Sequence, residues 1–377
     1  IELKCQAFAI PDPVYLWKKG NKTLEIGGRI TQDGGTIKIT TASSYFDDGI
    51  YQCIARNKYG AALSARVLVK QAQIEYETKT DPVVLQAIQG EPLHIDPFDK
   101  ISSFPQPVFT WKTVINSEND DAKEIVPNER ISLDASTGTL YFANIIPDDR
   151  KQDRIYKLDV RNSIEDVTKG GSPYQIHVIP KTEANSKPTV MAPKRDAEEF
   201  EYVGIKGKNV TLMCFFGGFP TPRITWQLPL NPPHQSRLDC TKESNTRCLI
   251  TSLKYEDEGQ FTCRGTNIVA STQVRINLKI ASIPSFIEKP MSVNVSEGLD
   301  ATFQCTADAK PPAKVEWFSN GVFIDPQHPG NSRFIVKDNQ LTVTKVCKDC
   351  VGGLSDTDLQ VFQCRISNKH GEDYASA

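Results

Sequence analysis

Residues 210–226 read VTLMCFFGGFPTPRITW, in which an alternating apolar and polar segment ends at Cys214 and Trp226 follows twelve residues later. A second cysteine, Cys263, comes 49 residues after the first. The alternation is typical of a half-buried β-strand, because successive side chains of a strand point to opposite faces. Two cysteines at this distance, with a tryptophan between them, predict two strands joined across a core by a disulfide on which the tryptophan packs.

The same order of cysteine, tryptophan and cysteine recurs in two other parts of the chain. The tryptophan always lies twelve residues after the first cysteine, and the second cysteine follows the first by 48, 49 or 59 residues. This is the spacing of an immunoglobulin sandwich, in which the disulfide joins strands B and F and strand C carries the tryptophan. The sequence thus predicts three bridged sandwiches, with the sets Cys5–Trp17–Cys53, Cys214–Trp226–Cys263 and Cys305–Trp317–Cys364.

A fourth copy lies between the first two and lacks the cysteines. Residues 90–97 fill the strand B position, Trp111 comes fourteen residues after Pro97, and residues 155–158 fill strand F. Pro97 and Leu158 stand where the two cysteines would be. A disulfide that closes a loop of about 50 residues contributes roughly 4 kcal/mol in the chain-entropy model. We therefore expect this domain to be the least stable of the four.

These copies predict an all-β chain of four tandem immunoglobulin-like sandwiches of the I-set type. Domain 1 is expected over residues 1–70, truncated at its N-terminus; domain 2 over 71–180; domain 3 over 188–280; and domain 4 over 281–377, truncated at its C-terminus. Residues 181–187 are polar, without periodicity, and are expected to be a linker. This connection is long enough for the chain to double back, with domain 3 beside domain 2 and domain 4 beside domain 1 in a horseshoe. An extended rod with one flexible elbow is the alternative.

An arginine and an aspartate recur at fixed places in the copies. Each copy has an arginine that opens the strand D position, and three copies have an aspartate six residues before the second cysteine. Because the arrangement repeats, we expect ion pairs at one end of these three sandwiches rather than solvated charges. The expected pairs are Arg29–Asp47, Arg237–Asp257 and Arg333–Asp358. In domain 2, Asp148 and Asp149 lack the ligand spacing of a Ca²⁺ site and are interpreted as solvated loop acids.

Four further cysteines lie outside the repeated sets. Cys240 and Cys248 flank a polar turn between strands D and E and most simply form a cross-hairpin disulfide. Cys347 and Cys350 form a Cys-x-x-Cys motif in a long connection between strands E and F. Such a motif is redox-active where a helix N-terminus lowers the thiol pKa, but here a strand precedes it, and zinc would need four ligands at matched spacing. We therefore expect two small structural disulfides, Cys240–Cys248 and Cys347–Cys350.

Composition indicates an extracellular protein. Ten cysteines in an even set predict an oxidising compartment, so the chain is expected to be secreted or at the cell surface. The 44 basic and 46 acidic residues give a net charge of −2, which provides no electrostatic basis for binding nucleic acid or an acidic membrane. The sequence contains no apolar run of about 18 residues and no signal peptide. Both ends read as interrupted strands, so we expect a piece of a larger protein whose membrane anchor lies elsewhere.

Motifs that would carry other chemistry are few. Three Asn-x-Ser/Thr sequons predict N-glycosylation at Asn21, Asn209 and Asn294. Asn21 is expected in a loop, whereas Asn209 leads into a core strand and is expected to be poorly accessible. The five histidines are scattered, and neither a nucleophile motif nor a glycine-rich phosphate loop occurs. The sequence therefore predicts no enzyme, and no catalytic residue, cofactor or metal.

Residues 51–62, YQCIARNKYGAA, resemble the hairpin of strands F and G in neural cell adhesion molecules of the neuroglian and neurofascin type, and in the insect immune protein hemolin. Residues 89–93 and 138–145 resemble segments of the second domain of the same group. The resemblance covers all four domains and the long linker. It implies a four-domain horseshoe that mediates homophilic adhesion between cells, as the ectodomain of a single-pass membrane protein. The unbridged domain 2 and the two extra cysteine pairs depart from the group.

Three functions remain open on these grounds. The leading one is the ectodomain of a neuronal adhesion receptor that binds a second copy of itself in trans, or another cell-surface protein. The second is a soluble pattern-recognition protein like hemolin, which would bind microbial lipid or sugar. The third is the extracellular part of a receptor kinase or phosphatase. The sequence that follows Ala377 would distinguish the three.

Overall fold

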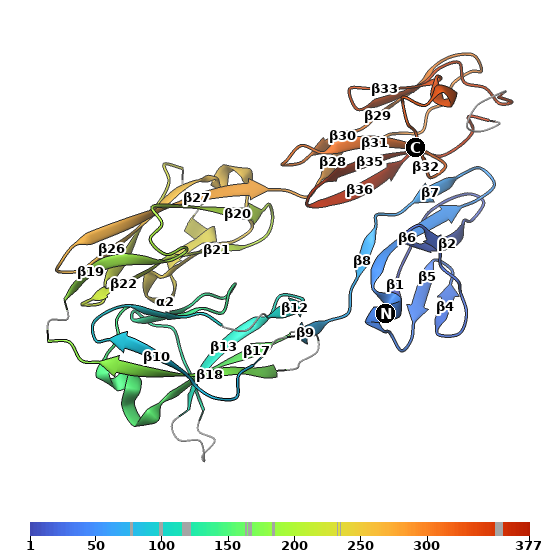
Figure 1. The fold of residues 1–377 in the computed structure, drawn as a ribbon. Helices are drawn as coiled ribbons and strands as arrows, with labels where there is room; N and C mark the ends of the chain where they lie inside the picture. Colours follow the sequence, from blue (N-terminus) through green and yellow to red (C-terminus); the bar gives the residue numbers. More distant parts are fainter. Residues whose placement is uncertain are drawn as a thin grey trace. The chain divides into compact units, whose positions relative to one another are not determined.

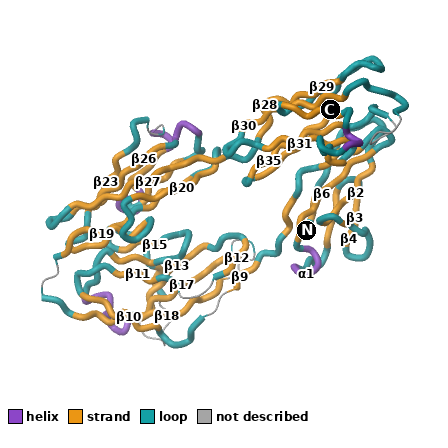
Figure 2. The backbone as a smooth tube through the Cα atoms, turned by 45° about the horizontal axis from the view of Figure 1, so that its top comes forward, coloured by secondary structure: helices purple, strands orange, loops and turns teal. Residues whose placement is uncertain are grey.

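The computed structural model describes most of the chain. The described residues are 1–75, 78–97, 101–114, 122–162, 164, 168–182, 185–231, 233, 235–350 and 357–377. Residues 183 and 184 of the predicted linker lie outside them. Strands dominate the described part and its helices are single turns or little more, as Figure 2 shows in orange and purple. Among the described residues, the helices are too short and too polar to cross a lipid bilayer.

The chain forms two compact units, and each contains two β-sandwiches (Figure 1). Unit 1 joins residues 1–71 to residues 281–377, so it contains domains 1 and 4. Unit 2 covers residues 72–280 and contains domains 2 and 3. The expected placement of domain 4 beside domain 1, and of domain 3 beside domain 2, is therefore found within the two units.

Domain 1 consists of two antiparallel sheets on either side of a small core. One sheet has the order β1 (Glu2–Leu3), β5 (Thr36–Ile39), β4 (Ile30–Asp33). The other has the order β3 (Lys22–Thr23), β2 (Val14–Lys19), β6 (Gly49–Arg56), β7 (Ala61–Leu63), with β8 (Val67–Val69) also paired to β6. A single helical turn, α1 (Ser44–Asp47), leads into β6. Strand β7 is consequently an edge strand within its own domain.

Domain 2 contains a five-stranded sheet. It runs β10 (Val83–Ile88), β18 (Thr168–Ile179), β17 (Ile155–Arg161), β13 (Val108–Val114), β14 (Lys123–Glu124). Facing it are β11 (Leu93–Ile95), β16 (Leu140–Phe142) and β15 (Ile131–Leu133), and β9 (Gln73–Glu75) pairs with β12 (Ser102–Phe104). A 3-10 helix over Pro147–Asp153 precedes β17. Strand β10 pairs in parallel with the second half of β18, while the other described pairs of this sheet are antiparallel.

Domain 3 repeats this plan with fewer strands. Its larger sheet runs β20 (Glu199–Ile205), β27 (Ser271–Ala281), β26 (Gly259–Thr266), β23 (Arg223–Gln227). The smaller runs β21 (Val210–Met213), β25 (Arg247–Ile250), β24 (Leu238–Thr241), and β19 (Ser186–Ala192) pairs with β22 (Phe215–Phe219). A turn labelled α2 (Lys242–Asn245) joins β24 to β25, and 3-10 turns cover Gln235–Arg237 and Tyr255–Asp257.

Domain 4 has the same two-sheet plan. One sheet runs β29 (Ala301–Gln304), β34 (Gln340–Val343), β33 (Phe334–Lys337). The other runs β32 (Val322–Phe323), β31 (Lys314–Ser319), β35 (Phe362–Asn368), β36 (Gly371–Ser376), and β28 (Ser285–Glu288) pairs with β30 (Thr306–Asp308). A 3-10 turn covers Pro329–Asn331.

One register is common to all four domains. The tryptophan of the third sandwich strand lies directly opposite the second cysteine position, in the pairs Trp17–Cys53, Trp111–Leu158, Trp226–Cys263 and Trp317–Cys364. Because side chains alternate along a strand, this register turns both members of each pair to the inner face. Four clusters of buried apolar side chains form around these positions. The sequence spacing therefore marks the centre of each core.

Candidate functional site

Disulfides join the two sheets of three domains. The structure pairs Cys5 with Cys53, Cys214 with Cys263, and Cys305 with Cys364. Two smaller disulfides, Cys240–Cys248 and Cys347–Cys350, take up the other cysteines, so none of the ten, all of which are described, is free. Cys240 and Cys248 lie in the antiparallel strands β24 and β25, whose pairing brings them opposite each other.

Domain 2 replaces the disulfide with aromatic packing. Leu158 is fully buried opposite Trp111. The Trp111 indole N–H donates to the carbonyl of Gly138 at 2.8 Å, and its ring lies 5.6 Å from the ring of Tyr174. A buried indole that satisfies its N–H contributes a large apolar area without leaving an unpaired donor. Because domain 2 has no disulfide, we expect its core to depend on Trp111 more than the bridged cores depend on their tryptophans.

The three predicted Arg–Asp pairs are confirmed. Nη1 of the arginine lies 2.7 Å from the carboxylate in Arg29–Asp47 and Arg237–Asp257, and Arg333 binds Asp358 through Nη2. The Arg29 guanidinium holds the pKa of Asp47 below its usual value, against the effect of burial. These pairs fix the connection before strand F to the start of strand D, so their role is structural.

Domain 2 has a fourth pair, and the interpretation of Asp149 as a solvated acid is wrong. Its side chain is 1% exposed and accepts two hydrogen bonds of 2.9 Å from Arg130. The sequence pattern missed this pair because the 3-10 helix over Pro147–Asp153 lengthens the connection. Asp149 consequently lies nine residues before Leu158 rather than six. The arginine at the strand D position was the signal that could have found it.

A tyrosine hydroxyl reinforces the same corner in the first two domains. Tyr51 donates to the carbonyl of Asp47 at 3.0 Å, and Tyr156 donates to the carbonyl of Asp149 at 3.2 Å. Burial raises the pKa of Tyr156 to about 12, so its hydroxyl stays protonated and keeps donating at physiological pH. The equivalent Phe261 and Phe362 are buried without a hydroxyl, and their corners rest on packing and the ion pair.

Contacts between domains are candidates for function because they fix which surfaces the protein presents. In unit 1, the side-chain amide of Gln363 in domain 4 binds the backbone of Leu63 in domain 1. The Leu63 N–H donates to Gln363 Oε1 at 2.7 Å, and Gln363 Nε2 donates to the Leu63 carbonyl at 3.1 Å. Gln363 is only 1% exposed. The Gln363 amide thus pairs with backbone groups of the edge strand β7 as a neighbouring strand would. The same two hydrogen bonds satisfy the buried polar atoms of the Gln363 side chain.

A second side chain of domain 4, Asn320, binds the same segment of domain 1. Its Oδ1 accepts from the N–H of Ala61 at 3.1 Å, and also from the N–H of Val361 at 3.2 Å. A Cβ atom on Gly60 would lie 2.5 Å from Asn320 Oδ1 and 2.9 Å from Val361 N. The backbone of domain 1 can therefore approach domain 4 closely only because residue 60 is glycine.

We expect the substitution Gly60→Ala to loosen the contact between domains 1 and 4. The added methyl group overlaps backbone that cannot swing away, and overpacking of this kind costs about 1–3 kcal/mol. Hydrogen exchange of the peptide that contains Ala61 and Leu63 measures the effect, because both amides donate to domain 4. Lys58→Ala, an exposed change in the same turn, is the control. Unchanged protection in the Gly60→Ala protein would contradict this role of Gly60.

Charged groups close the other end of this contact. Arg66 of domain 1 donates from Nε to Oε1 of Glu372 at 2.8 Å and also binds its second oxygen, and Arg365 lies 3.8 Å from the same carboxylate. The Glu372 side chain is only 11% exposed. Burial by itself would raise the pKa of Glu372, but the hydrogen bonds from Arg66 outweigh it and hold that pKa below its usual value.

Acid should therefore release domain 1 from domain 4. Because the folded-state pKa of Glu372 is depressed, its stabilising effect is present above the unfolded value of about 4.3 and is lost as pH falls through the folded value. Exchange of residues 60–66, corrected for the intrinsic rate, should accelerate below pH 4 relative to strand β25. Glu372→Gln should remove most of this acid dependence. If the acid-induced acceleration of exchange persisted in Glu372→Gln, another titrating group would be responsible for it.

The contact within unit 2 uses backbone and a buried amide. The N–H of Gly218 in domain 3 donates to the carbonyl of Ala143 in domain 2 at 2.7 Å. Asn144 Nδ2 returns hydrogen bonds to the Gly218 carbonyl at 3.0 Å and to Thr221 Oγ1 at 2.9 Å, and Asn144 is fully buried. Tyr141 packs into the core of domain 3, 6.0 Å from the Phe215 ring. Domains 2 and 3 thus share part of one core.

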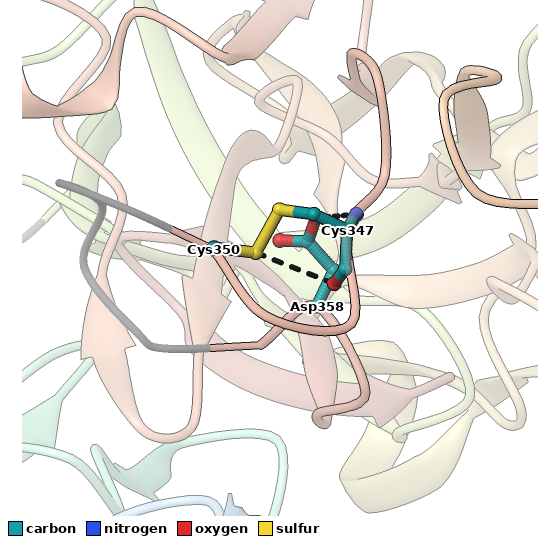
Figure 3. Close-up of side chains that lie close together, drawn as sticks. All are labelled: Cys347, Cys350 and Asp358. Carbon is teal, nitrogen blue, oxygen red and sulfur yellow. Dashed lines mark hydrogen bonds between the residues drawn. A yellow bond between two sulfur atoms is a disulfide. The ribbon is translucent and has the colours of Figure 1, made fainter.

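Cys347, Cys350 and Asp358 form a small cluster in domain 4 (Figure 3). Their sulfur and carboxylate atoms lie within 4.8 Å of one another, a grouping that resembles a metal site. The two sulfurs are bonded to each other, however, and thiolate is the form that binds metal. Asp358 Oδ2 accepts from the Cys347 N–H at 2.8 Å and binds Arg333. The cluster therefore braces the connection between strands E and F against the corner ion pair.

The three sequon asparagines are all exposed. Asn21 lies in the tight turn between β2 and β3, and Asn294 lies in the segment after β28. Asn209 is also exposed, contrary to the expectation of poor access, because it precedes β21 and faces outward while its Oδ1 accepts from the Ser252 N–H at 3.0 Å. Glycosylation at each of the three stays a prediction.

Comparison with known proteins gives the class of this chain. The family description "Immunoglobulin I-set domain" matches residues 284–377, and "Immunoglobulin domain" matches residues 1–57 and 187–267. The four sandwiches with their strand B–F bridges and packed tryptophans agree with these matches. The chain is a member of the immunoglobulin superfamily.

Within that superfamily, the chain is a relative of the neural cell adhesion molecules of the neuroglian type. It is 26% identical to neuroglian of Drosophila melanogaster over 99% of this chain and 28% of that protein. The corresponding values are 27%, 100% and 29% for neural cell adhesion molecule L1 of Mus musculus, and 26%, 100% and 28% for neurofascin of Gallus gallus. The chain thus spans less than a third of the length of these relatives. These homologues are adhesion proteins rather than enzymes.

Solved four-domain structures share the fold. Immunoglobulin domains 1–4 of Sidekick-1 match with a TM-score of 0.74 and 20% identity, covering 100% of this chain and 92% of that one. The insect immune protein hemolin matches with a TM-score of 0.74 and 22% identity, covering 100% and 94%. At these identities, the likeness supports the fold of four immunoglobulin domains and not a shared activity.

Proposed function

We propose that this chain is part of the ectodomain of a neuronal cell-surface adhesion receptor, located on the extracellular side of the plasma membrane and acting by homophilic binding between cells. Its homologues are adhesion molecules of the immunoglobulin superfamily, and several of them are named neural or neuronal cell adhesion molecules. All ten cysteines are oxidised, as expected in an extracellular compartment. Other cell-surface proteins are further partners under this proposal.

The observation that carries the proposal is the pair of hydrogen-bonded contacts that holds the sandwiches together two by two. Gln363 and Asn320 bind the edge of domain 1, and Asn144 binds domain 3. A stable protein interface buries about 800 Å² on each partner, a large part of one face of a small domain. Two domains locked side by side offer a wider and more rigid face than one, and rigidity lowers the entropy cost of binding.

A bead assay tests homophily directly. Fluorescent beads that carry the purified chain should cluster, and beads of two colours that both carry it should form mixed clusters. Beads that carry the reduced and alkylated chain are the control, since they present the same composition without the fold. Beads that stay single, together with a monomer in sedimentation at tens of micromolar, would rule out homophilic adhesion by these four domains.

A surface assay separates this function from recognition of microbes. The likeness to hemolin concerns the fold alone, so the adhesion proposal expects no selective binding to bacterial lipid or polysaccharide. The immune function would be favoured instead if the chain bound to lipopolysaccharide-coated beads and beads that carry only the chain did not cluster.

A further inference from the structure

Among the five disulfides, whose ten cysteines are all described, Cys347–Cys350 in domain 4 is the one in which neither cysteine is buried (Figure 3). We propose that this bond is a redox modification site. A dithiol reductant of the thioredoxin class reduces it while the four other disulfides stay intact, and the reduction loosens the contact between domains 4 and 1. The inference does not rest on the proposed adhesive function, because it concerns a contact within a single chain.

Access and loop size distinguish this disulfide from the other four. Each of the others has at least one cysteine that is fully buried, among them Cys53, Cys214, Cys248 and Cys305. A reductant must reach a sulfur atom in order to attack it, so the partly exposed pair reacts first. Its sequence separation is 3, against 8, 48, 49 and 59 in the other bonds. Because a shorter closed loop adds less stability in the chain-entropy model, the fold loses least when this bond opens.

The reaction at this site is a thiol–disulfide exchange, in which the protein is the substrate and not the catalyst. A thiolate of the reductant attacks one of the two sulfurs, the bond between Cys347 and Cys350 breaks, and a mixed disulfide with the reductant forms. The second thiol of the reductant then displaces the protein sulfur from the mixed disulfide. The protein gains two electrons and two protons and keeps two thiols, and the reductant is oxidised to a disulfide.

The corner that carries this bond differs from the corners of the other three domains. In every domain the corner aspartate accepts a hydrogen bond from a backbone N–H that lies before it in the chain. In domains 1, 2 and 3 the donor is three or four residues away, at Ser43, Ile146 and Lys254. In domain 4 the donor is Cys347, eleven residues before Asp358. A longer connection leaves its ends more conformational freedom, so the disulfide is what keeps the Cys347 N–H directed at the aspartate.

Asp358 connects this corner to the segment that contacts domain 1. Its N–H donates to the carbonyl of Cys347 at 3.0 Å, while its carboxylate accepts from the Cys347 N–H at 2.8 Å. Two residues further on, the N–H of Gln360 donates to the Asp358 carbonyl at 2.9 Å. Gln360 Oε1 in turn accepts from Asn320 Nδ2 at 3.0 Å. The position of residues 358–361 therefore depends on where Cys347 is held.

Asn320 and Val361 are the points at which this segment touches domain 1. Asn320 Oδ1 accepts from the N–H of Val361 at 3.2 Å and from the N–H of Ala61 at 3.1 Å. A Cβ atom on Gly60 would lie only 2.8 Å from Val361 Cγ2, so the two domains leave no space between them here. Continuous hydrogen bonds and packed groups of this kind carry coupling between distant sites. Release of Cys347 therefore displaces Val361 and uncovers the edge of β7.

Alkylation followed by mass spectrometry tests the selectivity of the reduction. The folded full chain is incubated with thioredoxin, its reductase and NADPH, and the thiols that appear are trapped with N-ethylmaleimide. We expect labelling of Cys347 and Cys350 to be roughly tenfold faster, or more, than labelling of the other cysteines. The second short disulfide, Cys240–Cys248, is the internal control. The proposal would be overturned if that pair were labelled equally fast, or if Cys347 and Cys350 stayed unlabelled.

Hydrogen exchange tests the coupling to domain 1. The double variant Cys347→Ser, Cys350→Ser should exchange residues 60–66 several-fold faster than the oxidised wild type, and the selectively reduced wild type should match the variant. Cys240→Ser with Cys248→Ser removes a short disulfide from domain 3 and should leave residues 60–66 unchanged. Protection of β34 has to persist, since its loss would mean that domain 4 as a whole had unfolded. Exchange of residues 60–66 that stays slow, or that accelerates only together with β34, would make the bond a structural brace and nothing more.

Discussion

Replacing Trp111 by alanine should unfold domain 2 while domains 1 and 4 stay folded. Removal of a buried tryptophan costs about 3–5 kcal/mol, and the loss here includes the contact with Tyr174 and the hydrogen bond to Gly138. No disulfide limits the unfolded ensemble of this domain, so little stability remains in reserve. Hydrogen exchange measured peptide by peptide should show loss of protection in β13 and β17.

The matched control is Trp17→Ala in domain 1. Trp17 is also buried, and its indole N–H donates to the carbonyl of Gly35 at 3.1 Å, so the truncation removes similar groups. The Cys5–Cys53 bridge persists, however, and keeps the two sheets together. We expect domain 1 to lose protection only partly. Equal loss in the two variants would show that the missing bridge of domain 2 is offset by contacts other than Trp111.

Contacts with domain 3 are the ones that could compensate for the missing disulfide of domain 2. Tyr141 and Ala143 of domain 2 are buried in the cluster that surrounds the core of domain 3. Unfolding domain 2 therefore exposes part of that core as well. We expect protection in β22 of domain 3 to fall together with that of domain 2 in the Trp111→Ala protein, whereas β26, on the far side of the core, should be less affected.

The cores of this protein could be predicted from the sequence because their determinants are local and repeated. A cysteine, a tryptophan twelve residues later and a second cysteine fix the register of two strands, and the structure places Trp226 opposite Cys263 as this pattern predicts. The Arg237–Asp257 pair followed from the same repetition. Where a 3-10 helix changed the spacing, as before Tyr156, the pattern failed and the Arg130–Asp149 pair was missed.

The contacts between domains could not be predicted from the sequence. The residues that form them are of the same type, and stand at the same sequence position, as residues of other domains that form no such contact. Gln52 and Gln363 occupy the same position, one residue before the second cysteine. Gln52 donates to the carbonyl of Ser64 in its own domain, whereas Gln363 binds Leu63 of a domain some 300 residues away. Both side chains face outward from their own sandwich, and Gln363 is buried only because domain 1 packs against it. A single sequence contains no signal for that difference.

Replacing Asp257 by alanine should destabilise unit 2 by about 1–3 kcal/mol, since it leaves the Arg237 guanidinium, whose side chain is 17% exposed, without its hydrogen-bond partner. Asp257 is fully buried and accepts two hydrogen bonds of 2.7 Å from Arg237. Burial alone would raise the pKa of Asp257, but hydrogen bonds from Arg237 and the Lys254 N–H outweigh it and keep the pKa below its usual value. The carboxylate therefore contributes stability above about pH 4, and this contribution is lost as pH falls through the folded-state pKa.

Urea unfolding from pH 7 to pH 3 tests both parts of this prediction. The wild-type chain should lose stability below pH 4 more steeply than Asp257→Ala, because only the wild type has this carboxylate to protonate. Glu256→Ala removes an adjacent acid whose side chain is 70% exposed, and should change stability by no more than about 0.5 kcal/mol. Adding Arg237→Met to Asp257→Ala should recover part of the loss, since an apolar side chain needs no partner in that place. If the double variant were no more stable than Asp257→Ala, the cost would lie in the corner hydrogen bond to the Lys254 N–H and not in the unpaired charge.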